Sequence, residues 1–519
     1  MASFRNDKVT AGSRRSHPRR NAFGGTMSPL WILLLITVAP HTLLPCWRGE
    51  HTCLFVAEAW MIPGKMSPFT TPARLKRPEQ NPGHHGHKRW NMLLDPRNGP
   101  ENTTSLSSAS SSSMMASSSS SSLKSSRSII KVEKFARLPV WPVWHGVLIW
   151  IVSNIFGFEA GAKLEDAIGG RVCPNFFGQQ QAGGKDGASA VVVDTSPFIM
   201  LVHHCHSFWK FDPIRFIQKQ FILAEGFPAH PHRGFTTVTY FLKGGFVHRD
   251  SSGVKQVYGN HNSLPHTQWL FTGAGLLHEE MFDIDDSNVS DFFNSRQELY
   301  QLWLNVPAKD KLLPPTSYLL GNDDIKDRTY DHVTPHVVAG DGSSETIVIS
   351  GSYQGRVSDA PASPEDVCIF HVKCKPGATW TYTLPTSNSV TDPYTCIVYI
   401  RQGSLSSVDD DGDETTVPVH HTAYFDPNGS SPNLVFHAND QTGVDFMLLA
   451  GRPLNEPMAA QGSMVMNTGN EINVAYQDYQ LGRMGRPWDH KVSTSEWRQH
   501  VQKYPCTYQY QEPPSASED

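Results

Sequence analysis

Two short motifs near the middle of the chain constrain its fold and function more than any other feature. The first is His230-x-His232 and the second is His278-x-Glu280. Side chains of a β-strand alternate between its two faces, so His230 and His232 share one side of a strand, as do His278 and Glu280. If the two strands face each other inside a small barrel, they offer three imidazole nitrogens and one carboxylate oxygen to one metal ion.

This donor set suits a divalent first-row transition metal that keeps open coordination positions. Iron(II) is favoured for oxygen chemistry, and manganese, cobalt, nickel, copper and zinc remain alternatives. Each motif alone is a common accident, and the four residues could be ordinary side chains of a core or a surface. Because both motifs occur in one strand-rich segment, we predict one metal ion per chain, with His230, His232, His278 and Glu280 as its ligands.

The segments around these motifs are typical of short β-strands. Residues 235–242 alternate well and contain three threonines, a tyrosine and a valine, and Gly244-Gly245 supplies a tight turn into a returning strand. From residue 164 onward, many short strand candidates separated by Gly and Pro predict a barrel or jelly roll. A later group of strand candidates carries no His-x-His motif: 346–350, 367–373, 394–400 and 446–449. We therefore predict two barrels, with the metal site in the first.

Several motifs resemble those of the pirin family, which belongs to the cupin superfamily. They follow the pirin order, at residues 226–240 (GFPAHPHRGFTTVTY), 268–269 (QW), 272–281 (TGAGLLHEEM), 301–309 (QLWLNVPAK), 449–457 (LAGRPLNEP) and 465–468 (VMNT). The resemblance implies an all-β bicupin of two jelly-roll β-barrels. It places an N-terminal pirin domain at 164–345, a C-terminal pirin domain at 346–485 and a tail at 486–519. Apolar residues at helical spacing within 471–481 predict a helix that closes a barrel.

The resemblance also implies an activity. It suggests an iron-dependent dioxygenase of quercetin-like flavonols, with a small phenolic substrate and dioxygen as partners. Glu280 would be the proton acceptor, because a carboxylate that moves partly off the metal is the only nearby base other than imidazole. An alternative from another class is a non-enzymatic, iron-bearing, redox-sensitive interaction protein or transcription cofactor.

Four other side chains near the motifs bear on this reading. Thr236 and Thr237 stand where many pirins carry a glutamate, which changes the polarity of the pocket. Arg233 and Gln268 are expected to orient the metal ligands or to stabilise the fold, since an outer hydrogen bond usually orients each ligand.

Charge and cysteine usage argue against other classes. The net charge is only −5, so no broad basic surface favours nucleic acid or an anionic membrane. The eight cysteines are scattered without a Cys-x-x-Cys pair, which argues against a disulfide-dense scaffold or a structural zinc ribbon. The run at 203–206 (HHCH) could form a second metal site. Because consecutive strand residues point to opposite faces, we predict instead a structural or pocket-rim segment.

The N-terminal third of the chain carries signals unrelated to the barrels. Residues 1–50 contain an apolar run at 29–39 behind basic residues, which is typical of a targeting or signal-anchor segment. Residues 51–130 contain a serine tract and are predicted to be a disordered linker. Residues 131–163 are predicted to form a hydrophobic helix, since 138–158 contain no Asp, Glu, Lys or Arg. This helix either spans a membrane or lies on the protein or an interface.

These N-terminal signals bear on the compartment. They favour the secretory pathway or an organelle such as a plastid, with a membrane anchor. The resemblance to pirins favours the nucleus or cytoplasm instead.

Overall fold

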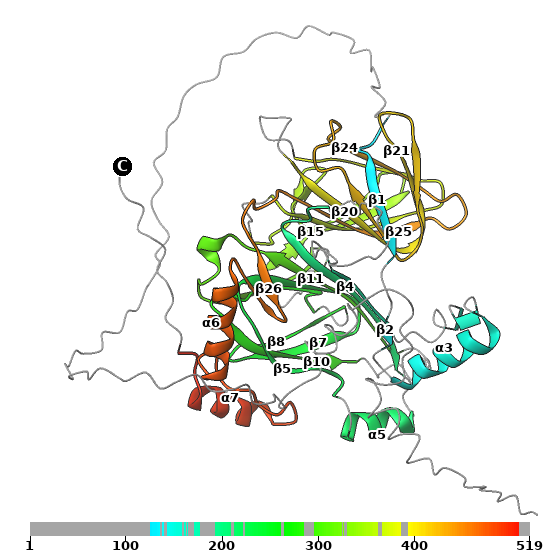
Figure 1. Cartoon of the computed structure of the whole chain (residues 1–519). Coiled ribbons are helices and arrows are strands. Elements are labelled where there is room, and N and C mark those ends of the chain that lie inside the picture. The colour runs from blue at the N-terminus through cyan, green and yellow to red at the C-terminus, as the bar shows by residue number, and fades with distance from the viewer. Residues whose placement is uncertain are drawn as a thin grey trace, which may run out of the picture. The chain divides into compact units, whose positions relative to one another are not determined.

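A computed structural model shows a mostly β-sheet protein with two barrels, which confirms the predicted all-β bicupin fold (Figure 1). The structure describes residues 125–134, 138–139, 143–157, 160–161, 163–164, 171–176, 193–208, 212–221, 224–260, 264–284, 295–323, 325, 330–361, 366–385 and 393–507. The predicted targeting segment at 1–50 and nearly all of the predicted disordered linker at 51–130 lie outside these described residues.

The N-terminal barrel consists of two β-sheets packed face to face. The larger sheet contains, in spatial order, β13 (His332–Thr334), β12 (Thr316–Asn322), β9 (Thr267–Phe271), β6 (Phe235–Lys243), β11 (Ser295–Asn305), β4 (Phe198–Phe208), β3 (Arg171–Phe176) and β2 (Leu138–Pro139). The smaller sheet contains β5 (Gly226–His232), β10 (Leu276–Asp283), β7 (Gly245–Asp250) and β8 (Lys255–Gly259). Phe241 of the larger sheet packs with Phe246 and Tyr258 of the smaller one in a buried aromatic cluster.

The C-terminal barrel has the same two-sheet construction. Its larger sheet contains β1 (Ile129–Lys134), β23 (His421–Phe425), β20 (Thr395–Gly403), β25 (Val444–Gly451), β18 (Cys368–Cys374), β15 (Ser344–Ser350) and β14 (His336–Val338). Its smaller sheet contains β19 (Thr379–Thr383), β24 (Asn433–Ala438), β21 (Leu405–Val408) and β22 (Glu414–Val417). Apart from β1, the strands of the C-terminal sheet begin along the chain at β14, earlier than the predicted domain start at residue 346.

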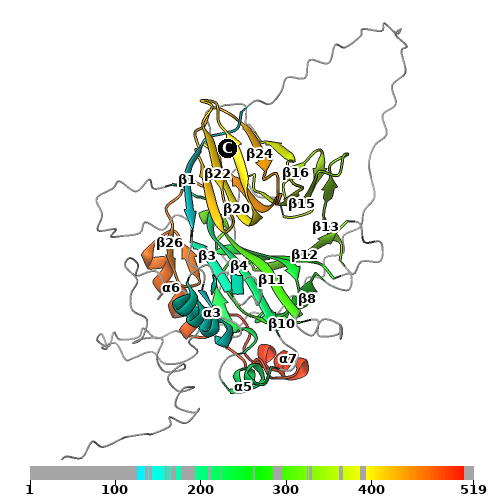
Figure 2. The same ribbon diagram turned by 90° about the vertical axis from the view of Figure 1, so that its right-hand side faces the viewer.

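The two barrels pack against each other through the outer faces of their larger sheets (Figure 2). On β11 the alternation of side chains is clear: Tyr300 and Leu302 belong to the buried cluster between the barrels, whereas Gln301 and Trp303 point the other way, into the N-terminal barrel. Ile397 and Tyr399 of β20 complete the cluster from the C-terminal barrel. Both faces of these central strands are therefore buried, as in a sheet covered on both sides.

A buried ion-pair network joins the two barrels beside this cluster. Arg401 of the C-terminal barrel donates two hydrogen bonds to Glu298 of the N-terminal barrel, with N–O distances of 2.7 and 3.0 Å. A third bond of 2.7 Å runs from Arg401 to Asp445. His203 lies 3.1 Å from Glu298, and His371 lies 3.0 Å from Asp445. The carboxylates are thus paired on both sides, which offsets the cost of burying them.

The segment before the first barrel packs on the second one. Strand β1 runs antiparallel to β23 at the edge of the C-terminal sheet. The buried guanidinium of Arg127 donates to backbone carbonyls of this barrel, including those of Ser431 at 2.9 Å and Tyr394 at 3.1 Å. The predicted helix over 131–163 is therefore wrong for its first residues, because the hydrogen bonds of 131–134 go to a distant sheet edge.

The C-terminal segment, conversely, follows the second barrel in sequence and packs on the first one. It contains β26 (Ala459–Gln461), β27 (Met464–Met466), α6 (Gly469–Gln480) and α7 (Thr494–Lys503). Asp478 of α6 accepts a 2.9 Å hydrogen bond from Arg233, and the indole of Trp488 donates a 2.8 Å bond to Glu279. The helix predicted at 471–481 is confirmed by α6, whereas the predicted tail at 486–519 contains a packed helix, α7.

Two further helices lie beside the N-terminal barrel: α3 (Val143–Phe156) and α5 (Pro213–Phe221). Helix α3 ends at Phe156, and the next residue, Gly157, adopts a positive φ of 93° that L side chains rarely adopt. It occupies only the middle of the predicted segment 131–163. Among the residues that the structure describes, no helix has the length and apolarity needed to cross a membrane.

Candidate metal centre

The candidate site lies on the smaller sheet of the N-terminal barrel. Strands β5 and β10 pair antiparallel, and His278 stands directly opposite His230 in their register. His232 is the last residue of β5, where Gly234 turns the chain with a φ of 84°. A Cβ atom on Gly234 would lie 2.1 Å from the carbonyl oxygen of Val465, so only glycine fits this turn. The turn and the strand register together hold the three histidines at one place.

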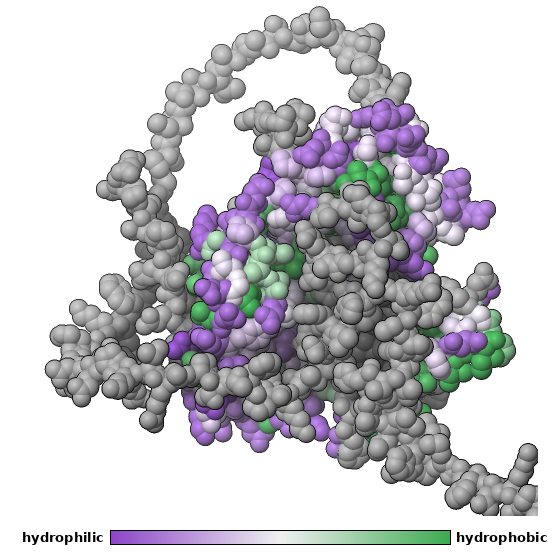
Figure 3. All heavy atoms as spheres, viewed as in Figure 1, coloured by the Kyte–Doolittle hydropathy of each residue, from purple (hydrophilic) through white to green (hydrophobic). Residues whose placement is uncertain are grey.

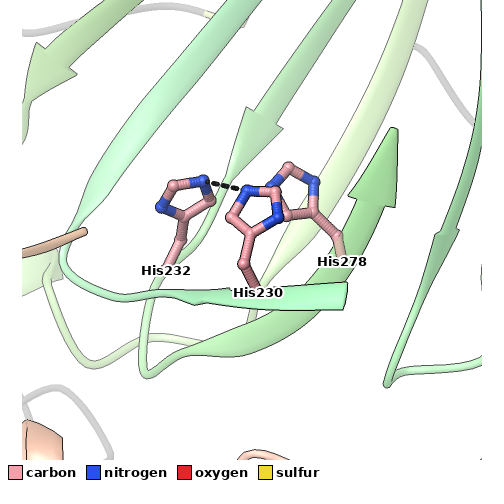
Figure 4. Close-up of side chains that lie close together, drawn as sticks. All are labelled: His230, His232 and His278. Carbon is pink, nitrogen blue, oxygen red and sulfur yellow. Dashed lines mark hydrogen bonds between the residues drawn. The ribbon is translucent and has the colours of Figure 1, made fainter. Parts of the chain in front are cut away.

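Figure 4 shows the three imidazole rings directed toward one another. Their centroids are 4.4 Å apart for His230 and His278, 4.7 Å for His232 and His278, and 4.8 Å for His230 and His232. Their candidate ligand atoms all lie within 4.8 Å of one another, and His232 and His278 are buried. The predicted histidines therefore form one compact cluster.

The hydrogen bonds of the cluster leave nitrogens that suit a cation. His230 Nδ1 lies 2.9 Å from the carbonyl oxygen of Pro228. A carbonyl oxygen can only accept a hydrogen bond, so Nδ1 carries the proton and Nε2 carries the lone pair. That Nε2 faces Nε2 of His232 at 3.1 Å. Neither ring nitrogen of buried His278 has a hydrogen-bond partner among the described residues. Buried polar atoms without partners are costly, and a bound metal ion would remove that cost, so the residues fit a metal.

Burial sets the protonation state of the cluster. It lowers the pKa of His230 to about 4 and holds the pKa values of His232 and His278 well below the ordinary histidine value. Mutual repulsion among the three rings acts in the same direction for His232 and His278. All three are therefore neutral imidazoles at neutral pH, the form that binds transition metals.

Comparisons with known proteins agree with this fold. The family model described as "Pirin" matches residues 183–304, and the one described as "Pirin C-terminal cupin domain" matches residues 369–485. A pirin-like protein from Solanum lycopersicum is 32% identical over 260 residues, which cover 50% of this chain and 77% of that protein. The chain belongs to the pirin family.

One further relative carries a name that mentions an activity. A Pseudomonas aeruginosa protein named "Putative quercetin 2,3-dioxygenase" is 32% identical over 265 residues, which cover 50% of this chain and 80% of that protein. Among solved structures, a quercetin 2,3-dioxygenase from Acinetobacter baumannii is similar over 70% of this chain and 99% of its own, with 22% identity and a TM-score of 0.49.

In this member of the pirin family, Glu280 lies outside the cluster of three histidines. Its carboxylate accepts hydrogen bonds from the side-chain amide of Gln301 at 3.2 Å and from the hydroxyl of Tyr258 at 3.5 Å. The indole of Trp303 donates to the amide oxygen of Gln301 at 3.3 Å, which directs the amide nitrogen toward Glu280. Burial raises the pKa of Glu280 to about 7. The predicted fourth ligand is thus adjacent to the cluster and held by its own hydrogen bonds.

A fourth histidine, absent from the sequence prediction, borders the site. The ring of His248 lies 5.3 Å from that of His278, and its Nε2 is 3.2 Å from Asp250. Asp250 in turn accepts hydrogen bonds from the backbone N–H groups of Ser252 and Val254. The signal that could have found the pair is the alternation in β7, because His248 and Asp250 stand opposite Glu280 and His278 on β10.

The outer side chains predicted around the site have separate roles. Arg233 donates to the carbonyl oxygen of Ala274 at 2.6 Å and binds Asp478, so it stabilises the fold. Gln268 accepts a 3.1 Å hydrogen bond from the hydroxyl of Tyr258. The same hydroxyl contacts Glu280, so Tyr258 connects Gln268 to Glu280. Among the described residues, the run at 203–206 forms no second metal cluster, because the group at 230, 232 and 278 is the only one found there.

Proposed function

We propose that this chain is an iron(II)-dependent dioxygenase that acts on a flavonol-like or related phenolic compound and dioxygen. The observation that carries the proposal is the convergence of His230, His232 and His278, whose ligand atoms all lie within 4.8 Å of one another. The name of the Pseudomonas aeruginosa relative supports a substrate like quercetin. In this proposal the three imidazoles hold the ion, and Glu280 is its fourth ligand or the proton acceptor.

An iron ion bound there would supply Lewis acidity and redox chemistry with dioxygen. The protein's own part begins with Glu280, whose carboxylate would accept a proton from a phenolic hydroxyl of the substrate. Gln301 and Tyr258 keep that carboxylate in place beside the histidines. Phe235 and Trp303 lie with their rings 5.1 and 5.4 Å from His232 and would exclude water from it.

Metal content and oxygen uptake, measured together on the full chain purified without air, test the proposal. We expect about one equivalent of iron per chain and oxygen consumption when a flavonol is added. A His230→Ala/His278→Ala variant should lose both, because two of the three imidazoles are gone. His437→Ala is the matched control, since His437 is an exposed histidine of the C-terminal barrel.

The outcomes separate the two candidate functions. Iron bound without turnover across a panel of phenolic compounds would favour the non-enzymatic, redox-sensitive interaction protein. A chain that takes up no divalent metal at all would contradict both, because each of them needs the histidine cluster to be a metal site.

A further inference from the structure

Helix α3 is apolar on the face that contacts the protein and also on the face that does not. His145 and Ile149 are buried on its inner side. On its outer side, Trp150 is 59% exposed, Ile155 is 66% exposed and Phe156 is 72% exposed. No residue from Val143 to Phe156 is charged at neutral pH, because the helix contains no Asp, Glu, Lys or Arg and burial lowers the pKa of His145 to about 4. The outer face of α3 therefore differs from the polar outer face of an ordinary surface helix.

This outer face forms an exposed hydrophobic patch. Figure 3 shows the patch at the position that α3 occupies in Figure 1. Ile151 and Ile155 are one helical turn apart, so they lie next to each other beside Trp150. A contiguous exposed patch of large apolar side chains marks a surface that binds a partner or a membrane, unlike single exposed apolar residues, which are common.

Helix α5 adds a second set of exposed apolar side chains and is tied to α3. The indole of Trp144 donates a 2.7 Å hydrogen bond to Asp212, which also accepts from the first backbone N–H groups of α5 at 2.9 and 3.1 Å. On α5, Ile214, Phe216 and Ile217 are 47%, 70% and 45% exposed. One aspartate thus joins the N-terminal ends of two helices that both expose apolar side chains.

The charges of the two helices favour a lipid surface with anionic headgroups. Neither helix contains Asp or Glu. The Lys219 side chain of α5 is 60% exposed and pairs with Glu225 at 3.0 Å, a carboxylate that Arg215 of the same helix also binds, so two cations share one anion. Lys491 binds the carbonyl oxygen of Gln220 at the end of α5. Lysines at the edge of an apolar face, together with tryptophan, are the arrangement by which a helix lies in the membrane interface. The 14 residues of α3 extend about 21 Å, less than the hydrocarbon core of a bilayer.

We propose that α3 and α5 form a membrane-docking surface, which places Trp150, Ile155 and Phe216 at the boundary between headgroups and acyl chains of an anionic bilayer. The proposal is independent of the metal site and of the proposed activity. In it, the barrels remain in the aqueous phase while the two helices lie along the lipid surface.

Co-sedimentation of the full chain with vesicles tests the proposal. The probes are vesicles of phosphatidylcholine alone and of phosphatidylcholine mixed with phosphatidylserine. For a Trp150→Ser/Ile155→Ser/Phe216→Ser variant, the partition coefficient onto the mixed vesicles should fall at least about tenfold, because three apolar anchors are removed. The matched control is Val357→Ser/Leu481→Ser, whose side chains are similarly exposed, at 66% and 64%, but lie away from α3 and α5.

Each result decides the proposal. Binding of the wild type and the control to the mixed vesicles, with loss in the α3/α5 variant, supports it. No binding of the wild type, or equal binding of the α3/α5 variant, overturns it. Sedimentation velocity on the same samples tests whether a second copy of this chain binds the α3/α5 surface instead. A dimer that only the α3/α5 substitutions dissociate, without vesicle binding, would overturn the membrane proposal in favour of dimerisation.

Discussion

The two barrels share one architecture but fill their interiors differently. Inside the N-terminal barrel, three imidazoles converge on the smaller sheet. Inside the C-terminal barrel, Trp380 stacks between Tyr353 and Phe436, with ring centroids 5.5 and 5.7 Å away. The same fold therefore supports a polar site in one domain and a dry aromatic core in the other. The difference lies in a few inward-pointing residues, because the strand layout is common to both.

The largest expected effect is on the dry core. Trp380→Ala should destabilise the C-terminal barrel by about 3–5 kcal/mol, because it leaves a cavity where a fully buried indole packed. Denaturant unfolding measures this loss. Iron content of the folded variant should stay at the wild-type level, since the histidines lie in the other barrel. A parallel loss of iron would show that the two interiors are coupled and would break the comparison.

The next effect concerns the contact between the barrels. Arg401→Ala should cost about 3 kcal/mol, because it leaves Glu298 and Asp445 buried without their shared cation. A single broad unfolding transition in the wild type should separate into two, one for each barrel, when unfolding is followed by circular dichroism and tryptophan fluorescence. Arg356→Ala is a suitable control, because that arginine forms an exposed ion pair with Asp323.

The same network predicts a dependence on pH. Burial alone would raise the pKa of Glu298, but hydrogen bonds from His203 and Arg401 outweigh it and hold the pKa well below its ordinary value of 4.5. Its contribution to stability is therefore complete above pH 4.5 and is lost as the pH falls below that value. We expect the free energy of unfolding to fall between pH 5 and pH 3, measured with urea. In Glu298→Gln this fall should be shallower, and an identical pH profile would contradict the assignment.

Local patterns predicted the two interiors better than the connections between them. The strand expected at 235–242 is β6, and the two motifs lie on β5 and β10. These predictions succeeded because the alternation of side chains along a strand can be recognised from neighbouring residues alone. The pairing of β1 with β23 joins residues almost 300 positions apart, and no local pattern encodes it. For the same reason the sequence did not show that Gln301 and Tyr258 hold Glu280 in place beside the histidine cluster.

The metal site should stabilise its barrel only when it is loaded. With a chelator present, His278→Leu should be as stable as the wild type or up to about 1 kcal/mol more stable, because the imidazole it replaces has two buried nitrogens without partners among the described residues. With iron(II) at about a hundred times its dissociation constant, the wild type should gain about 2.7 kcal/mol. Calorimetry without air would measure both, and an equal gain in the variant would mean that iron binds elsewhere.

The smallest effect concerns α7, the helix that follows the C-terminal barrel in sequence and packs on the N-terminal barrel. Ser493 caps α7 in a capping box with Glu496, and Trp497 of that helix is fully buried. Ser493→Ala should cost about 1 kcal/mol, because the backbone N–H of Glu496 loses its partner, the Ser493 hydroxyl. Hydrogen exchange should become faster in α7 and in its contact at Arg249, whose guanidinium binds the carbonyl oxygen of Val492. The contacts of α7 lie on the N-terminal barrel. Faster exchange in the C-terminal barrel instead would therefore contradict the expectation that α7 stabilises the N-terminal barrel.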